Sequence, residues 1–202
     1  KIKIETELNT ELDYGILGYF SGKSVKESCV SFGPEISEID IYKSKSLAAA
    51  LGTSGVCGMF SNKEIDGNNI SFGKEEEKSV MDELNTTESG DVIALGSPQL
   101  GTHELELLSN MIDGKKFSKK CIIFCPRSLY EKASNSGVAQ RLENAGGNLI
   151  CDACTCLSPL LTHEEYDGVI TNSVKAAHYL NKSSGVAVCL TDLRSIIRKY
   201  TR

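Results

Sequence analysis

The chain lacks the features that mark a membrane protein or a nucleic-acid-binding protein. Its 202 residues contain no apolar stretch of the roughly 18 to 20 residues that a spanning helix needs, and no charged-then-apolar leader. A net charge of −5 and a pI of about 5.3 leave no basic stripe that would neutralise phosphates. We therefore expect a cytoplasmic protein that binds neither membrane nor nucleic acid, and whose partner is a small molecule or another protein.

Signatures of common cofactor and catalytic sites are also missing. Neither G-x-G-x-x-G nor G-x-x-x-x-G-K-S/T follows the apolar run at 91–95. No serine-hydrolase elbow is present, and the paired C-x-x-C spacing of a structural zinc site does not occur. Nucleotide binding, serine hydrolysis and structural zinc therefore have little support.

Cysteine is the residue type that the chain does have in quantity. Three of its eight cysteines, Cys151, Cys154 and Cys156, lie within six residues at the end of an apolar run. Closely spaced thiolates are soft ligands for iron or an iron–sulfur cluster. Cys151 and Cys154 also form the C-x-x-C of a redox pair, and buried cysteines can simply fill a core. Without a leader, the even number of cysteines does not indicate a disulfide framework, so we expect a reducing compartment.

The chain divides into two parts at the linker-like segment 85–90, NTTESG. We place the N-terminal part at 1–88 and the second part at 89–202. Hydrophobic spacing predicts three helices and three short strands in the first part, over 10–23, 43–52, 75–84, 28–33, 56–61 and 70–73. The sequence thus predicts a smaller α/β segment ahead of a larger domain.

The second part alternates apolar runs with helical segments. The runs fall at 91–95, 121–125, 149–151, 168–171 and 186–190. Helices are predicted over 102–112, from Pro126 through Ala133, over 172–180 and over 191–200, the last with Thr191 as its N-cap. Continuous apolar strands, each followed by a helix, indicate a parallel sheet covered on both faces. The predicted fold class is α/β, with a Rossmann-like sheet in this domain.

Short polar motifs follow the first four of these strands. They read GSPQ, CPRS, CDACTC and TNS, at 96–99, 125–128, 151–156 and 171–173. Open parallel sheets bind ligands beyond the carboxyl ends of their strands. We therefore expect the four motifs to converge on one edge of the sheet and to form a site there.

The loops offer residues for an anionic ligand. Asn172 and Ser173 open a predicted helix whose backbone N–H groups would face an anion, with Lys175 one turn in. Arg127 heads another helix and could clamp a carboxylate or phosphate. The simpler reading is that Asn172 only caps its helix and His178 packs against the fold. His103 and His163 are expected at the surface.

Six segments occur in an order that resembles a known family. GYFSGK, SLAAALGTSGVCGMF, VIALGSPQLGTHEL, CPRSLYE, CDACTCLSPL and TNSVKAAHYL are similar to the latter half of the large subunit of the aconitase X family, over nearly all 202 residues. The resemblance implies an aconitase-like hydro-lyase. An iron–sulfur cluster or mononuclear iron would act as a Lewis acid on a substrate hydroxyl, while a base removes the adjacent proton.

The resemblance also assigns roles. It implies that Cys154 is a cluster ligand and that Arg127, Asn172, Ser173, Lys175 and His178 bind substrate. It implies two partners that complete the enzyme. One is a small swivelling subunit that supplies a catalytic serine, and the other is the missing N-terminal half of the large subunit. No catalytic residue is assigned within this chain.

The chain departs from the family at the first motif. Many members read Gly-Cys-Pro-His where this chain has Ser97 and Gln99, so Ser97 falls on the second ligand position. An oxygen ligand binds iron less softly than a thiolate. Cys151 or Cys156 could be recruited instead.

Three functional hypotheses follow. Dehydration of phosphomevalonate is favoured over dehydration of cis-3-hydroxyproline, because the segment KAAHY at 175–179 and the apparently separate subunits look more like the former enzyme. The second hypothesis is a degenerate interaction module that kept the fold and lost the cluster. The third, a thiol redox protein using Cys151 and Cys154, is the least favoured because no helix is evident after the C-x-x-C.

Overall fold

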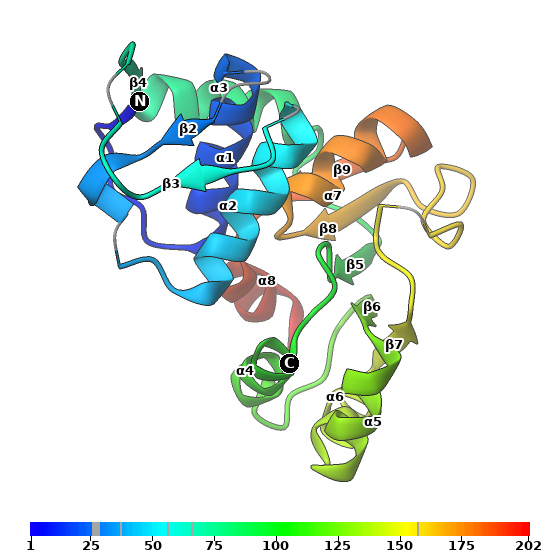
Figure 1. Cartoon of the computed structure of the whole chain (residues 1–202). Helices are drawn as coiled ribbons and strands as arrows, with labels where there is room; N and C mark the ends of the chain where they lie inside the picture. The colour runs from blue at the N-terminus through cyan, green and yellow to red at the C-terminus, as the bar shows by residue number, and fades with distance from the viewer. Residues whose placement is uncertain (26–28, 37, 56, 66, 157) are drawn as a thin grey trace. The chain divides into compact units, whose positions relative to one another are not determined.

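The computed structural model describes residues 1–25, 29–36, 38–55, 57–65, 67–156 and 158–202. The chain forms two compact units, Lys1–Leu84 and Asn85–Arg202 (Figure 1). None of the helices described is both long and apolar enough to cross a membrane.

The first unit is built on a close pair of helices, α1 (Glu11–Val25) and α2 (Ile41–Ser54), which pack against each other (Figure 1). A Cβ atom at Gly18 would lie 2.3 Å from the carbonyl oxygen of Leu47. The two helices can approach this closely only because α1 carries glycine at the contact. Helix α3 (Lys74–Leu84) completes the helical part of the unit.

Two small parallel sheets and a short 3₁₀ turn complete this unit. Strand β1 (Ile2–Ile4) pairs with β4 (Ile70–Phe72). Strand β2 (Val30–Ser31) pairs with β3 (Phe60–Ser61), and the turn η1 spans Gly33–Ile36. Strand β1 was not predicted. The strands expected over 28–33 and 56–61 are wrong in length, since only two residues of each are paired. Their first residues, Ser28 and Val56, lie outside the described residues.

The second unit contains a five-stranded parallel sheet in the order β7-β6-β5-β8-β9. The strands β5 to β9 span Val92–Leu95, Lys120–Cys125, Gly147–Cys151, Gly168–Thr171 and Ala187–Leu190. The helices are α4 (Thr102–Ile112), α5 (Arg127–Asn135), α6 (Val138–Asn144), α7 (Val174–Tyr179) and α8 (Leu193–Tyr200). The π-helical turn η2 (Leu180–Ser184) follows α7. The predicted α/β fold class with a Rossmann-like parallel sheet is confirmed.

The core of this unit lies between one face of the sheet and helices α4, α5, α6 and α8. Ile93, Leu95 and Ile123 alternate with residues of the opposite face, as strand geometry requires. They pack with apolar side chains such as Leu108 of α4 and Ile196 of α8, both fully buried. The apolar runs of β5, β6 and β8 therefore correspond to strands buried on both faces, whereas the outer strand β7 is only partly buried.

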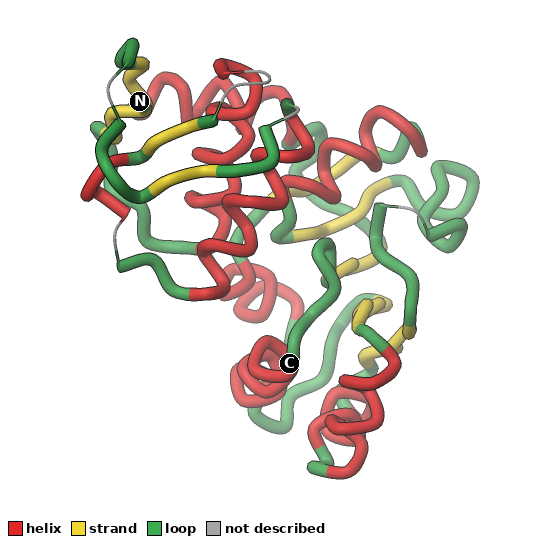
Figure 2. Tube along the Cα trace, in the orientation of Figure 1, coloured by secondary structure: helices red, strands yellow, loops and turns green. Residues whose placement is uncertain are grey.

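Three details differ from expectation. Helix α6 was not predicted, and α8 begins at Leu193 rather than at 191. The cap of α8 is Asp192, whose side chain accepts a hydrogen bond from the Ser195 backbone N–H, at 2.9 Å. Thr191 precedes the cap, and its N–H donates to the Thr171 carbonyl and so extends the strand pairing. In addition, β7 is not followed by a helix; the described residues of the connection to β8 form a loop throughout (Figure 2).

The segment expected as a linker is tied to the second unit. The Asn85 side chain accepts a hydrogen bond from the Leu190 N–H, and Thr86 accepts one from the Val188 N–H, both at 2.8 Å. These residues therefore run along the outer strand β9, and the second compact unit begins at Asn85, ahead of the expected boundary at residue 88.

Candidate functional site

The candidate site lies where the strand order reverses. Strands β5 and β8 are neighbours, but the chain proceeds from β5 toward β6 and β7 on one side and from β8 to β9 on the other. The loops that follow β5 and β8 therefore diverge, which is the place where open parallel sheets bind ligands. The connection that leaves β7 contacts the loop after β5 at this edge, through the hydrogen bond between Gln99 and Ala153.

The loop after β5 is held tightly against β6. Gly96 has φ of 108°, and a Cβ there would lie 2.4 Å from the carbonyl oxygen of Phe124. Both facts require glycine at this position. The Leu100 N–H closes the loop by donating to the same carbonyl, at 2.9 Å. Ser97, between them, is 4% exposed and so is held within the fold rather than at its surface.

A thiol and a hydroxyl meet beneath this loop. The Oγ of Ser97 lies 2.8 Å from the Sγ of Cys156, and both residues are buried. The half-buried Cys154 thiol lies close enough to Cys156 to interact with it electrostatically. Burial raises the pKa of Cys156 to about 11, while its hydrogen bond with Ser97 acts in the opposite direction. Two thiols and one hydroxyl thus come together at the switch point.

Ser173 joins the loops after β5 and β8. Its hydroxyl donates to the Ser97 carbonyl oxygen and accepts from the Ala176 N–H, at 3.0 Å in the second case. Ser173 is therefore the N-cap of α7, and Asn172 is not. Lys175 follows in the first turn of α7 and lowers the pKa of the Cys156 thiol by its positive charge. The positive charge of Lys175 thus lies near the Cys156 thiol.

Asp152 orients the arginine that follows β6. Its carboxylate accepts hydrogen bonds from the Arg127 backbone N–H at 2.9 Å and from Nε at 2.8 Å. Asp152 has φ of 60°, a left-handed conformation that aspartate tolerates better than most residues. The Arg127 side chain is 67% exposed, so part of its guanidinium faces solvent. The sequence reasoning missed Asp152, although its place directly after a strand was a signal.

The three clustered cysteines have different thiol neighbours. Cys151 lies opposite Cys125 in the β6–β7 register, and packs against the core. Burial raises the pKa of Cys125 to about 11, and the neighbouring Cys151 adds to that rise. Cys151 thus lies opposite Cys125, and Cys154 lies near Cys156. These neighbours do not favour a redox pair of Cys151 and Cys154, which is the least favoured hypothesis.

Gln99 holds the cysteine loop in place. Its Nε2 donates to the Ala153 carbonyl oxygen at 2.7 Å, which ties the loop after β5 to the loop after β7. The same tie keeps Cys154 and Cys156 near Ser97. Gln99 thus has a structural role in this chain.

The three histidines make contacts with residues other than the thiols. His178 stands in the last turn of α7 and makes an edge-to-face contact with the Tyr179 ring, with centroids 5.1 Å apart. His103 and His163 are exposed, as expected, with ring nitrogens near the Glu106 carboxylate and the Ser184 carbonyl. The structure thus brings together Ser97, Cys154, Cys156, Ser173 and Lys175, with Arg127 at an adjacent strand end.

The thiol pair and the hydroxyl make a partial donor set for iron. Thiolates suit iron and iron–sulfur centres, so the chemistry of these donors fits such a group. Among the residues that the structure describes, no three His, Cys, Asp or Glu side chains gather closely enough to hold a metal ion. Further ligands would have to come from outside this set.

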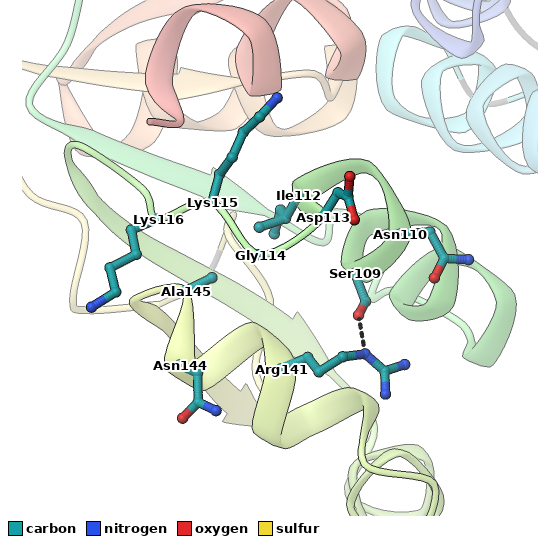
Figure 3. A pocket seen from close by; sticks show the side chains of 10 residues that line it. All are labelled: Ser109, Asn110, Ile112, Asp113, Gly114, Lys115, Lys116, Arg141, Asn144 and Ala145. Atoms are coloured by element: carbon teal, nitrogen blue, oxygen red, sulfur yellow. Dashed lines mark hydrogen bonds between the residues drawn. The ribbon is translucent and has the colours of Figure 1, made fainter.

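A surface cavity of about 530 Å³ lies at the opposite edge of the sheet (Figure 3). It is lined by the C-terminal ends of α4 and α6 and the loop after α4, and Arg141 donates there to the Ser109 hydroxyl at 2.9 Å. Lys115 and Lys116 add positive charge, but helix C-termini carry negative partial charge. No thiol lines this cavity, so it is separate from the candidate site.

Comparison with known proteins gives consistent likenesses. Residues 1–92 match the family described as "Aconitase X second domain", and residues 90–202 match "Aconitase X third domain". The phosphomevalonate dehydratase large subunit of Methanocaldococcus jannaschii is 29% identical, over 92% of this chain and 49% of that protein. That of Methanosarcina mazei is 28% identical, over 99% and 51% respectively. The chain therefore spans about half the length of these relatives.

Two further likenesses are relevant. The cis-3-hydroxy-L-proline dehydratase of Hypocrea jecorina is 31% identical over 52% of this chain and 18% of that protein. The crystal structure of Thermococcus kodakaraensis aconitase X, in its holo-form, has a TM-score of 0.84 and 24% identity, covering 98% of this chain and 54% of that one. On these matches, the chain belongs to the aconitase X family, of which it carries the second and third domains.

Proposed function

We propose that the chain is part of a large subunit of a dehydratase, which removes water from a small hydroxylated anion. The observation that carries this proposal is the group of thiols, hydroxyl and lysine at the switch point of the sheet. Phosphomevalonate is the favoured substrate, because several relatives that match almost the whole chain bear the name phosphomevalonate dehydratase large subunit.

The cofactor we propose is an iron–sulfur cluster or a mononuclear iron. Cys154 would hold it, with a second donor from Ser97 or from the Cys156 thiol in contact with it. Iron bound there would act as a Lewis acid that weakens the bond to the departing substrate hydroxyl. The remaining ligands would come from the N-terminal half of the large subunit.

The chain's own residues would bind and orient the substrate. Lys175, at the start of α7 after β8, and Arg127, after β6, supply positive charge at the same edge of the sheet, which suits an anionic phosphate or carboxylate. The Asp152 carboxylate accepts a hydrogen bond from Nε of Arg127. The terminal guanidinium nitrogens can then form a bidentate contact with the phosphate or carboxylate. Ser173 is engaged with Ser97 and α7, which makes it a positioning residue for the loop. Direct substrate contacts by Asn172 and His178 remain predictions.

The proposed partners follow from the missing part of the enzyme. The relatives are named large subunits, and this chain spans about half of each. We propose that a small swivelling subunit closes over the site and supplies the catalytic serine, while the N-terminal half of the large subunit completes the ligand set. Protein chains that co-purify with this chain test that assembly.

A second candidate is dehydration of cis-3-hydroxyproline, favoured by the likeness of half the chain to a dehydratase of that name. A degenerate interaction module is a third, since Ser97 and Gln99 replace family residues. Assays of the assembled complex with phosphomevalonate and with cis-3-hydroxyproline distinguish them. Water loss from phosphomevalonate alone supports the proposal. Activity on hydroxyproline alone favours the second candidate, and activity on neither, in a complex that binds no iron, favours the third.

A further inference from the structure

We propose that Cys156, together with Cys154, forms a Cys-x-Cys iron ligand pair, and that the Ser97 hydroxyl serves as a hydrogen-bond donor to the Cys156 thiolate. This inference rests on the proposed iron-dependent function and specifies its ligands. The resemblance implied Cys154 and placed the second ligand at Ser97. It implied nothing for Cys156.

The contact between Ser97 and Cys156 is the first observation. The Ser97 oxygen and the Cys156 sulfur lie 2.8 Å apart, although 59 residues separate them in the chain. An iron bound by either atom would therefore lie in the same part of the site. Ser97, in the loop after β5, has no sulfur to offer. Cys156, in the β7–β8 loop, can supply a sulfur ligand at this place.

Chemical preference decides between the two atoms. Iron favours a thiolate over a neutral hydroxyl, and a cysteine thiol loses its proton far more readily than a serine hydroxyl. The serine O–H can then donate to the metal-bound sulfur. Such outer-shell hydrogen bonds orient ligands and tune the metal, so a serine beside a cysteine ligand has a role of its own.

Thr155 gives an independent indication that a group is bound here. Its side chain is fully buried, and its hydroxyl has no hydrogen-bond partner within the part of the chain that the structure describes. Buried hydroxyls are normally paired. Thr155 lies between the two proposed ligands in sequence, where an acceptor atom of a bound group would satisfy its hydroxyl.

The loop that carries the pair is already anchored. Gln99 donates to the Ala153 carbonyl, immediately before Cys154, and the Asp152 N–H donates to the Cys125 carbonyl at 3.2 Å. These two bonds fix the start of the loop on the sheet edge. The protein's own hydrogen bonds therefore hold the pair at the edge of the sheet, which lowers the ordering cost of binding iron.

The test is iron retention by matched cysteine variants. The chain is purified anaerobically with its co-purifying chains and reconstituted with ferrous iron and sulfide; bound iron, acid-labile sulfide and the visible spectrum are then measured. We expect Cys156→Ser to weaken iron retention at least about tenfold, since even outer-shell changes cost that much. Cys151→Ser, in the same segment but packed against Cys125, should keep the wild-type iron content.

A rescue variant separates ligand loss from misfolding. Adding Ser97→Cys to Cys156→Ser returns one thiol to the site, so iron binding and the spectrum should recover. Wild-type iron retention and an unchanged spectrum in Cys156→Ser would overturn this inference while leaving the iron-dependent function intact. Failure of the wild-type complex to take up iron would overturn both.

Discussion

The hydroxyl of Ser173 donates a hydrogen bond to the backbone carbonyl oxygen of Ser97, 76 residues away in the chain. This bond links the loops after β5 and β8 across the point where the strand order reverses. The same hydroxyl caps α7. One side chain thus holds together the part of the molecule on which the proposed chemistry depends.

Replacing Ser173 should therefore affect both stability and activity. We expect Ser173→Ala to lower the free energy of unfolding by about 1 kcal/mol through loss of the cap. It should also lower the activity of the complex, because the Ser97 loop is released. Denaturant unfolding and turnover measure the two effects. Ser173→Thr, which keeps the hydroxyl, should behave like wild type; an equal loss in the threonine variant would contradict this role.

The ion pair of Asp152 with Arg127 should matter for substrate binding and little for stability. Both side chains are largely exposed, and such pairs contribute about 0 to 1 kcal/mol. Asp152→Asn tolerates the left-handed backbone but loses the charge that orients Arg127. We expect KM for an anionic substrate to rise with little change in the unfolding midpoint. An unchanged KM would remove Arg127 from the binding site.

Stability should fall at high pH because of the buried thiol of Cys125. Its pKa is raised by burial from the ordinary value of 9.0 to about 11. The unfolded chain therefore loses this proton at a lower pH than the folded chain. The stabilising contribution is complete below pH 9 and is lost as the pH rises toward 11.

The variant Cys125→Ala isolates this effect. Its stability deficit relative to wild type, measured by denaturant unfolding, should shrink between pH 9 and pH 11. A deficit that stays constant over this range would show that the thiol does not titrate differently in the folded and unfolded chains.

Gly96 should not accept a side chain. Its φ of 108° and the 2.4 Å approach to the Phe124 carbonyl both oppose a Cβ atom. We expect Gly96→Ala to destabilise the fold by more than about 1 kcal/mol. Gly52, in α2, has open space around its Cβ position, so Gly52→Ala should stabilise by up to about 1 kcal/mol. Unfolding curves that shift in the same direction would contradict this contrast.

The sequence predicted the second unit better than the first. The strands β5 to β9 are continuous apolar runs, and helix α4 has strong periodicity, so their signals are local. Helix α6 has only seven residues and follows Gly137, which leaves little pattern to detect. In the first unit, β2 and β3 pair over two residues only, a length set by tertiary contact rather than by local preference.

The position of the site was predictable, but its internal contacts were not. Parallel strands place all their following loops at one edge, which the order of motifs reveals. The route of the β7–β8 connection has no periodic pattern, and bonds such as that from Gln99 to Ala153 hold it in place. The meeting of Cys156 with Ser97 depends on that route, so the sequence left Cys156 as one of two alternatives.

The most direct test of the account is the iron and acid-labile sulfide content of the anaerobically purified complex, measured with its visible absorption spectrum. The account predicts bound iron that depends on Cys154, with Cys154→Ala losing the iron while its secondary structure is retained. A complex that contains all its chains and holds no iron after reconstitution would contradict the proposed iron-dependent dehydratase and would favour an interaction module.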